Sequence, residues 1–116
     1  SAPSSATPAP ATKGSYIDYA AYAANPGMYS AGKVVLFFHA GWCPKCRETD
    51  KNLTSDPASV PVGLTVVKAD FDNDNDLRQK YGVGVQHTFV QVDADGNELA
   101  TWTGTYTGAD IAGKTV

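Results

Sequence analysis

The residues of this chain best suited to chemistry are its two cysteines, Cys43 and Cys46, and the sequence contains no others. They lie in the segment 42–46, which reads Trp-Cys-Pro-Lys-Cys and follows the apolar run 34–38 directly. On a helix that begins near Cys43, residues three apart share a face, so the two sulfurs can form a disulfide or bind one metal ion together. A disulfide that closes so short a loop adds little stability. The spacing therefore indicates a redox or metal site.

The composition predicts one globular domain and excludes several functions. The chain has 116 residues, of which 42% are hydrophobic and 10% aromatic, as is ordinary for a single domain. Its net charge of −3 provides no basic surface for phosphates, so we exclude nucleic acid as a partner. No apolar stretch approaches the roughly 20 residues of a membrane-spanning helix. Two cysteines are also too few for the disulfide framework of a small secreted domain.

The N-terminal segment 1–14 differs in composition from the rest of the chain. Residues 1–12 are only Ser, Ala, Pro and Thr, which offer almost nothing to bury. We expect 1–14 to be a disordered tether and 15–116 to form one domain. A tether of this kind suits an exported protein, so we expect an extracytoplasmic location, periplasmic or envelope-anchored, with a membrane tether upstream of residue 1. A cytoplasmic location, with 1–14 as a trimmed end, is the alternative.

The middle of the chain alternates between strand and helix patterns. The continuous apolar run 34–38 predicts a strand at 33–39 that is buried on both faces, and 64–70 predicts a second, largely apolar strand. Helices are expected at 43–53 and 74–81, the second with acidic residues in its first turn and Lys80 in its last. Strands and helices of this order are typical of an α/β domain.

Shorter elements are expected at both ends of the domain. Residues 16–19 predict a first strand and 20–24 a short helix. The patterns at 87–93 and 98–104 predict two strands that form an antiparallel hairpin. A last helix is expected to begin at Thr107 with a side-chain cap. The complete order predicts an α/β fold with a central mixed β-sheet flanked by helices.

This order, with Trp-Cys-x-x-Cys at the end of the first strong strand, resembles the thioredoxin superfamily over residues 33–104. The segment 39–46 stands where that family has its active-site loop. Residues 68–72 resemble the family's second central strand and the aspartate after it, and 81–83 and 88–92 resemble the approach to the third strand and the strand itself. The resemblance implies a thioredoxin-like fold with a Cys-Pro-Lys-Cys active site.

Two positions depart from the family pattern. The family normally carries a cis proline immediately before the residue matched by Thr88, where this chain has His87. Because a cis bond before a non-proline costs roughly 2.5–4 kcal/mol, we expect the Gln86–His87 bond to be trans. Phe37 occupies the position where the usual thioredoxin buries an aspartate that assists the resolving cysteine. Lys68 is matched to a lysine near that aspartate, and without this partner we expect it to point to solvent.

Position and resemblance together make Cys43 the expected nucleophile. Its sulfur would lie accessible at a helix N-terminus, where free N–H groups and the helix dipole favour the thiolate. Cys46, one turn later and more buried, would resolve the mixed disulfide formed on Cys43. Pro44 suits the first helical turn because it has no N–H to lose. Trp42 would border the site or be a partly buried aromatic without a specific role, and Lys45 would either face solvent or lower the pKa of Cys43.

The two histidines, His39 and His87, are both matched to positions near the cysteine loop. Most lone histidines are structural, but His87 could replace the absent carboxylate as proton acceptor for Cys46.

Metal binding is the alternative function. Cys43, Cys46 and His87, with or without His39, are N and S ligands suited to Zn(II), Cu(I) or an iron–sulfur cluster. A structural zinc site more often uses two separated ligand pairs, and only one C-x-x-C is present.

The function implied by the resemblance is thiol–disulfide oxidoreductase, with the Cys43/Cys46 pair exchanging disulfides with the thiols of other proteins. The family binds extended partner segments through backbone contacts near the residues matched by 86–88. No cofactor is implied, and we expect a monomer. A change of one unit in the pKa of Cys43 corresponds to about 30 mV in reduction potential, so the sequence does not decide between reductase, oxidase and isomerase.

Overall fold

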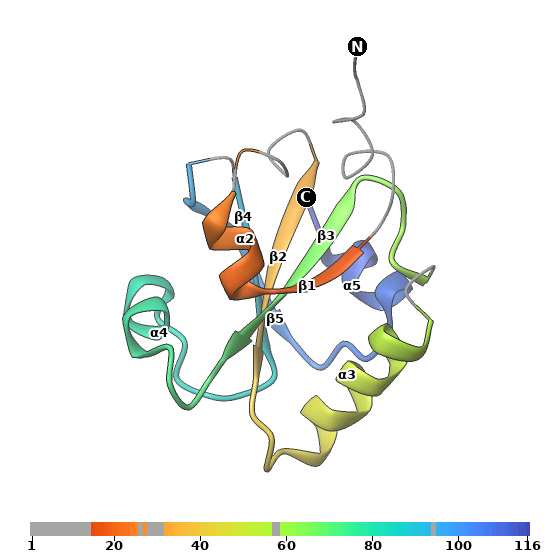
Figure 1. Cartoon of the computed structure of the whole chain (residues 1–116), viewed down its shortest axis with the longest axis horizontal. Helices are drawn as coiled ribbons and strands as arrows, with labels where there is room; N and C mark the ends of the chain where they lie inside the picture. The colour runs from red at the N-terminus through yellow and green to blue at the C-terminus, as the bar shows by residue number, and fades with distance from the viewer. Residues whose placement is uncertain (1–14, 26, 28–31, 57–58, 94) are drawn as a thin grey trace.

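A computed structural model describes residues 15–25, 27, 32–56, 59–93 and 95–116 of the chain. The expected tether, 1–14, lies outside the described residues. The described part contains one five-stranded sheet with helices packed against it (Figure 1). In chain order the elements are β1 (Ser15–Asp18), α2 (Tyr19–Ala24), β2 (Lys33–His39), α3 (Pro44–Ser55), β3 (Leu64–Asp70), α4 (Asn75–Tyr81), β4 (Thr88–Val92), β5 (Glu98–Thr103) and α5 (Gly108–Lys114).

The sheet is mixed, as the sequence predicts. Its strand order is β1-β3-β2-β4-β5, so the strand that ends at the cysteine loop, β2, is central. On one side β2 pairs in parallel with β3, and on the other it pairs antiparallel with β4. Strand β5 then completes the predicted antiparallel hairpin with β4. The fold is therefore α/β, with parallel and antiparallel pairs in one sheet.

Strand β2 forms the centre of the core. Five consecutive side chains, 34–38, are at most 3% exposed, which explains why this strand reads as a continuous apolar run. Alternate side chains point to opposite faces of a strand. Leu36 lines a cavity with Tyr22 of α2 and Tyr81 of α4, whereas the ring of Phe37 contacts those of Tyr16 and His87 on the face that α3 covers.

The helix boundaries differ little from those predicted. Helix α3 begins at Pro44, directly after Cys43, and the side chain of Thr107 caps α5 by accepting a hydrogen bond from the N–H of Asp110 at 3.1 Å. The predicted strand 87–93 is shorter at both ends. His87 has a φ of 60°, which a strand does not accommodate. None of the helices in the described ranges is long and apolar enough to span a membrane.

Candidate active site

The two cysteines lie at the N-terminus of α3, immediately beyond the end of β2. Cys43 is the N-cap residue, and its sulfur accepts a hydrogen bond from the backbone N–H of Cys46 at 3.2 Å. Pro44 occupies the first helical turn, as predicted. No disulfide joins the two cysteines in this structure. The predicted order of burial is confirmed, since Cys46 is fully buried and Cys43 is 2% exposed.

The low exposure of Cys43 corrects one expectation, because its sulfur was predicted to be accessible. The residues around it on the chain, Trp42, Pro44 and Lys45, are all exposed. The side-chain amide of Gln86, from the turn before β4, lies within hydrogen-bonding reach of the sulfur. Cys43 is therefore buried although its neighbours along the chain are exposed.

The surroundings of Cys43 favour its thiolate. Burial alone would raise the pKa of this thiol. Hydrogen bonds from the thiol and the backbone N–H of Cys46, from the Gln86 side chain and from the backbone N–H of Lys45 outweigh that effect and lower the pKa below its ordinary value. The contribution of Lys45 is thus its backbone N–H at the helix N-terminus, and its side chain lies on the exposed face of α3. Cys43 has the environment of a nucleophile.

The surroundings of Cys46 favour its protonated thiol. Burial raises its pKa most, and the hydrogen bond that it donates to Cys43 raises it further. The backbone groups of Ala40 and His87 lower the pKa of Cys46 but offset only part of this rise. The two sulfurs of one short loop therefore have opposite preferences, with the thiolate on Cys43 and the proton on Cys46.

The Gln86–His87 bond is trans, as predicted. His87 instead turns the chain with a left-handed φ of 60°, and its backbone N–H donates to the carbonyl of Phe38 at 2.9 Å. Its ring Nε2 lies 2.9 Å from the hydroxyl oxygen of Thr49 on α3. The influence of His87 on the pKa of Cys46 comes from its backbone and not from its ring. The structure therefore does not place the imidazole as the proton acceptor of Cys46.

The remaining contacts of the His87 ring are with other aromatic rings. The ring is 5% exposed and meets those of Phe37 and Phe89 edge-on, at centroid distances of 6.0 and 5.3 Å. The ring of Tyr106 lies 5.1 Å away on another side. Burial lowers the pKa of His87, since the charged imidazolium would lose its hydration. A neutral, packed histidine is the state that this environment favours.

The sequence predicted that Phe37 would replace the buried aspartate of the family, and this position is indeed an apolar part of the core. The Phe37 side chain is fully buried and stacks on Phe89 at 4.8 Å with an interplanar angle of 7°. A carboxylate is nevertheless present on the same side of the sheet, where Asp50 of α3 lies one helical turn after Cys46.

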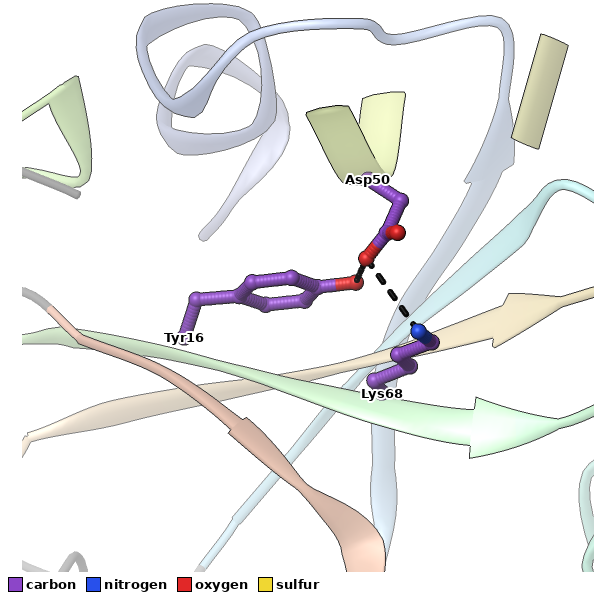
Figure 2. A network of polar contacts seen from close by, with 3 residues as sticks. All are labelled: Tyr16, Asp50 and Lys68. Carbon is purple, nitrogen blue, oxygen red and sulfur yellow. Dashed lines mark hydrogen bonds and ion pairs between the residues drawn. The ribbon is translucent and has the colours of Figure 1, made fainter. Parts of the chain in front are cut away.

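Asp50 is the centre of a polar network between α3 and two strands (Figure 2). It accepts a hydrogen bond from the Tyr16 hydroxyl at 2.7 Å, and its carboxylate lies 3.3 Å from the Lys68 ammonium. The prediction that Lys68 points to solvent is therefore wrong, because α3 supplies the carboxylate that β2 lacks. Sequence reasoning missed Asp50, although its spacing of four residues from Cys46 on the inner face of a helix was a usable signal.

The network shifts the pKa values of Tyr16 and Asp50 in opposite directions. Burial and the hydrogen bond to Asp50 raise the pKa of Tyr16. Burial would also raise the pKa of Asp50, but the Tyr16 hydroxyl and the Lys68 ammonium outweigh it and lower that pKa overall. Asp50 is thus held as a carboxylate, and the network joins α3 to β1 and β3.

His39, at the end of β2, lies beside the cysteine loop. Its ring meets Phe37 edge-on at 5.6 Å, and its Nε2 atom is buried without a hydrogen-bond partner. Burial lowers its pKa most, with a further lowering by Lys68, while nearby carboxylates such as Asp50 act in the opposite sense. Like His87, it lies in surroundings that favour the neutral ring.

Trp42 and Thr88 were both expected in the surroundings of the active site. Trp42 is 57% exposed, and its indole N–H donates to the carboxylate of Asp72 at 3.0 Å. Its ring meets that of Phe71 edge-on at 6.4 Å. Thr88 is buried, and its hydroxyl donates to the carbonyl of Val85 at 2.8 Å, which stabilises the turn before β4. The printed contacts of Trp42 thus go to the segment after β3, and its role as a border of the cysteine site stays a prediction.

A cavity of about 640 Å³ lies beside the loop and includes His39, Gly41 and Lys68 in its lining, but neither cysteine.

The structure does not support the alternative function, metal binding. In the part of the chain that the structure describes, no group of three or more His, Cys, Asp or Glu side chains could hold a metal ion. The expected set of Cys43, Cys46 and His87 is not assembled, since the His87 ring is hydrogen bonded to Thr49.

Comparison with known proteins places the chain. A model of the thioredoxin-like domain matches residues 29–114, and the chain therefore belongs to the thioredoxin-like family. At the level of this family, the domain and its cysteine pair support thiol–disulfide oxidoreductase as the class of protein. Among individual proteins, thioredoxin-1 of Drosophila yakuba is 32% identical over 57 residues, which are 49% of this chain and 53% of the relative. The match thus spans about half the length of that relative.

Solved structures show the same fold. Trxlp from Edwardsiella tarda superposes with a TM-score of 0.66 at 24% identity, covering 88% of this chain and all of the other. Deadhead, a germline-specific thioredoxin of Drosophila melanogaster, gives a TM-score of 0.62 at 23% identity, with 84% and 90% of the two chains covered. At these identities the likeness establishes the thioredoxin-like fold alone.

Proposed function

We propose that this protein is a thiol–disulfide oxidoreductase that exchanges disulfides with other proteins through Cys43 and Cys46. The observation that carries the proposal is the opposed pKa shift of the two thiols within one helix turn. The pKa of Cys43 is lowered by the hydrogen bonds that it accepts, and that of Cys46 is raised by burial. The reactive form of a thiol is its thiolate, so Cys43 attacks and Cys46 waits in its protonated form.

The reaction then has two steps. The Cys43 thiolate attacks one sulfur of a partner disulfide, which forms a mixed disulfide and releases the other partner sulfur as a thiolate. Cys46 next loses its proton and attacks the Cys43 sulfur. The Cys43–Cys46 bond forms, the mixed disulfide breaks, and the second partner sulfur leaves as a thiolate that takes up a proton. The protein loses two electrons to the partner, and the reverse sequence oxidises a partner dithiol.

A protein is the partner that this site suits best. The cavity beside the loop does not include either cysteine, so a small molecule bound there would not lie against the reactive sulfur. Two large exposed side chains, Trp42 and Val85, lie on the two segments that border Cys43 and offer apolar contact area to a partner segment. The direction of electron flow, the monomeric state and the extracytoplasmic location stay predictions.

The test is equilibration of the purified chain with defined ratios of reduced and oxidised glutathione, followed by quantification of the Cys43–Cys46 disulfide by mass. A reversible two-electron transition supports the proposal, and its midpoint gives the direction of electron flow. With a protein disulfide as substrate, Cys43→Ser should abolish exchange, whereas Cys46→Ser should accumulate the mixed disulfide. A pair that never oxidises reversibly would overturn the proposal.

A further inference from the structure

The ion pair of Asp50 and Lys68 lies on the same side of α3 as the resolving cysteine. Asp50 follows Cys46 by four residues within this helix, and residues at that spacing are surface neighbours with Cβ atoms about 5–6 Å apart. Cys46 is fully buried and Asp50 is half-buried, so both lie on the face that meets the sheet. The Asp50 carboxylate lies 3.3 Å from the ammonium of Lys68 on β3 (Figure 2). Two opposite charges are thus held one helical turn from the Cys46 sulfur.

Contacts with the sheet fix the position of both charges. The Tyr16 hydroxyl donates to the Asp50 carboxylate at 2.7 Å, which ties it to β1. Lys68 is paired in register with Phe37 of β2, whose side chain is fully buried. The side chains of Lys68 and Asp50 are 32% and 30% exposed, so solvent and salt screen them less than charges on the open surface.

Three titratable rings on this face of the sheet are uncharged at neutral pH. Tyr16, His39 and His87 all lie around the ring of Phe37, with centroid distances of 5.6–6.5 Å. Burial raises the pKa of Tyr16 and lowers the pKa values of the two histidines. Compared with these rings, the carboxylate and the ammonium of the ion pair act on Cys46 with full charges.

We propose that Asp50 and Lys68 are positioning residues whose opposite charges set the rate at which Cys46 resolves the mixed disulfide. The inference deepens the proposed function and rests on it. A carboxylate disfavours a nearby thiolate, whereas an ammonium favours it. While the pair is intact, the two effects offset each other at the Cys46 sulfur. Removal of one charge leaves the other unbalanced, so the two single removals act in opposite directions.

The step concerned is the attack of Cys46 on the sulfur of Cys43. Cys46 releases its proton to solvent, and its electron pair forms the Cys43–Cys46 bond. The bond between Cys43 and the partner breaks, and the partner sulfur leaves with the electron pair as a thiolate. At neutral pH the rate depends on the thiolate fraction of Cys46. A fall of about one unit in its pKa raises that fraction about tenfold and lowers its nucleophilicity about threefold, which leaves a net gain of about threefold.

The experiment mixes the reduced full-length chain with excess disulfide of thionitrobenzoate at pH 7 and follows the coloured thiolate by stopped flow. The first phase, attack by Cys43, depends on reagent concentration, and the second phase, closure by Cys46, does not. Asp50→Asn should speed the second phase about threefold, because the Lys68 ammonium is left unbalanced. Lys68→Met should slow it about threefold, and the double variant should return close to the rate of the unmodified chain.

The matched controls are Glu48→Gln and Lys51→Met, which make the same changes of charge at exposed positions of α3 and should leave the second phase unchanged. Far-UV circular dichroism checks that each variant is folded, and Lys68→Gln takes the place of Lys68→Met if the latter does not fold. A slower second phase in Asp50→Asn would identify Asp50 as a proton acceptor and overturn the inference. Changes in the same direction for both single variants, or no change in either, would overturn it too.

The failure of the inference and that of the proposed function give different results. If the unmodified chain shows no second phase and its cysteine pair does not oxidise reversibly with glutathione, the proposed function fails and the inference fails with it. If the second phase is present and the charge substitutions leave its rate unchanged, Cys46 still resolves the mixed disulfide and only the role of the ion pair fails.

Discussion

The hydroxyl oxygen of Thr49 lies 2.9 Å from Nε2 of His87, and this contact joins the helix that carries the cysteines to the turn beside them. The same hydroxyl lies 3.2 Å from the carbonyl of Thr105, so a third segment meets at this point. When the Thr49 proton is donated to a carbonyl, the imidazole must donate its own N–H to Thr49. His87 therefore acts as a structural link near the active site.

Replacing His87 with alanine should destabilise the protein by about 2–4 kcal/mol in urea unfolding, because buried ring contacts are lost and Thr49 loses a partner. Glycine at this position should be more stable than alanine by roughly 1 kcal/mol, since a φ of 60° strains only the latter. Neither variant should change the shape of the pH–rate profile of exchange. A profile altered at the pKa of an imidazole would restore the ring as the proton acceptor of Cys46.

The two histidines should make the protein less stable in mild acid. Burial is the largest cause that lowers the pKa of His39 and of His87. The unfolded chain, with imidazole pKa values near 6.5, then binds more protons than the native state. Stability should therefore be complete above about pH 6.5 and fall as the pH drops from there towards the lower native values. Urea titrations at a series of pH values would show this slope, and His39→Gln should reduce it.

Asp50 should stabilise the fold only while it is ionised. Its native pKa is lowered overall, so its contribution is present above the unfolded-state value of about 3.9 and is lost as the pH falls through the native value. Asp50→Asn should cost about 1 kcal/mol at neutral pH, and the difference from the unmodified chain should vanish in strong acid. Because both charged groups are about a third exposed, a double-mutant cycle with Lys68→Met should give a coupling of no more than about 1 kcal/mol. A difference that persists at low pH would contradict this account.

The two thiols should react at different stages. In the native reduced protein, iodoacetamide should modify Cys43 at a pH below the range of an ordinary thiol, since its pKa is lowered. Cys46 should stay unmodified until the chain is unfolded, because it is fully buried and its pKa is raised. Peptide mapping after limited alkylation, with and without urea, separates the two sites. Equal labelling of both thiols in the native state would argue against the assigned roles.

Two glycines of α5 should respond oppositely to the same substitution. A Cβ at Gly108 would collide with the backbone carbonyl of Ser59, so Gly108→Ala should destabilise the protein or displace the helix. At Gly113 a Cβ meets nothing within 4 Å, and Gly113→Ala should stabilise the protein by roughly 0.5–1 kcal/mol. Thermal unfolding of the pair provides the comparison, and equal effects would contradict the close approach at Gly108.

Much of the fold follows from local patterns. The strand at 33–39 is predictable because a strand covered on both faces must be apolar throughout, and the adjacent cysteines locate the helix that follows. The trans bond at His87 follows from the cost of a cis bond before a non-proline residue. The opposite preferences of the two thiols follow in outline from their positions at a helix N-terminus and one turn inside it.

Contacts between distant segments were not predictable in the same way. In this chain Phe37 replaces the family aspartate that would pair with Lys68. Nothing in the sequence next to Lys68 indicates that Asp50 of α3 supplies the carboxylate instead. The burial of Cys43 is a second example, and the turn before β4 contains a left-handed His87. A non-glycine residue in that conformation is uncommon, so the sequence alone favoured an open site.

The two tryptophans occupy opposite environments. Trp42 is exposed next to the nucleophile, whereas Trp102 is half-buried, stacks on Phe89 at 6.0 Å and donates its indole N–H to Thr105 at 3.1 Å. One chain thus carries two tryptophan fluorophores, one beside the cysteine loop and one packed against the core. Trp42→Phe and Trp102→Phe would separate the two emission signals, and each could then be followed without an added label.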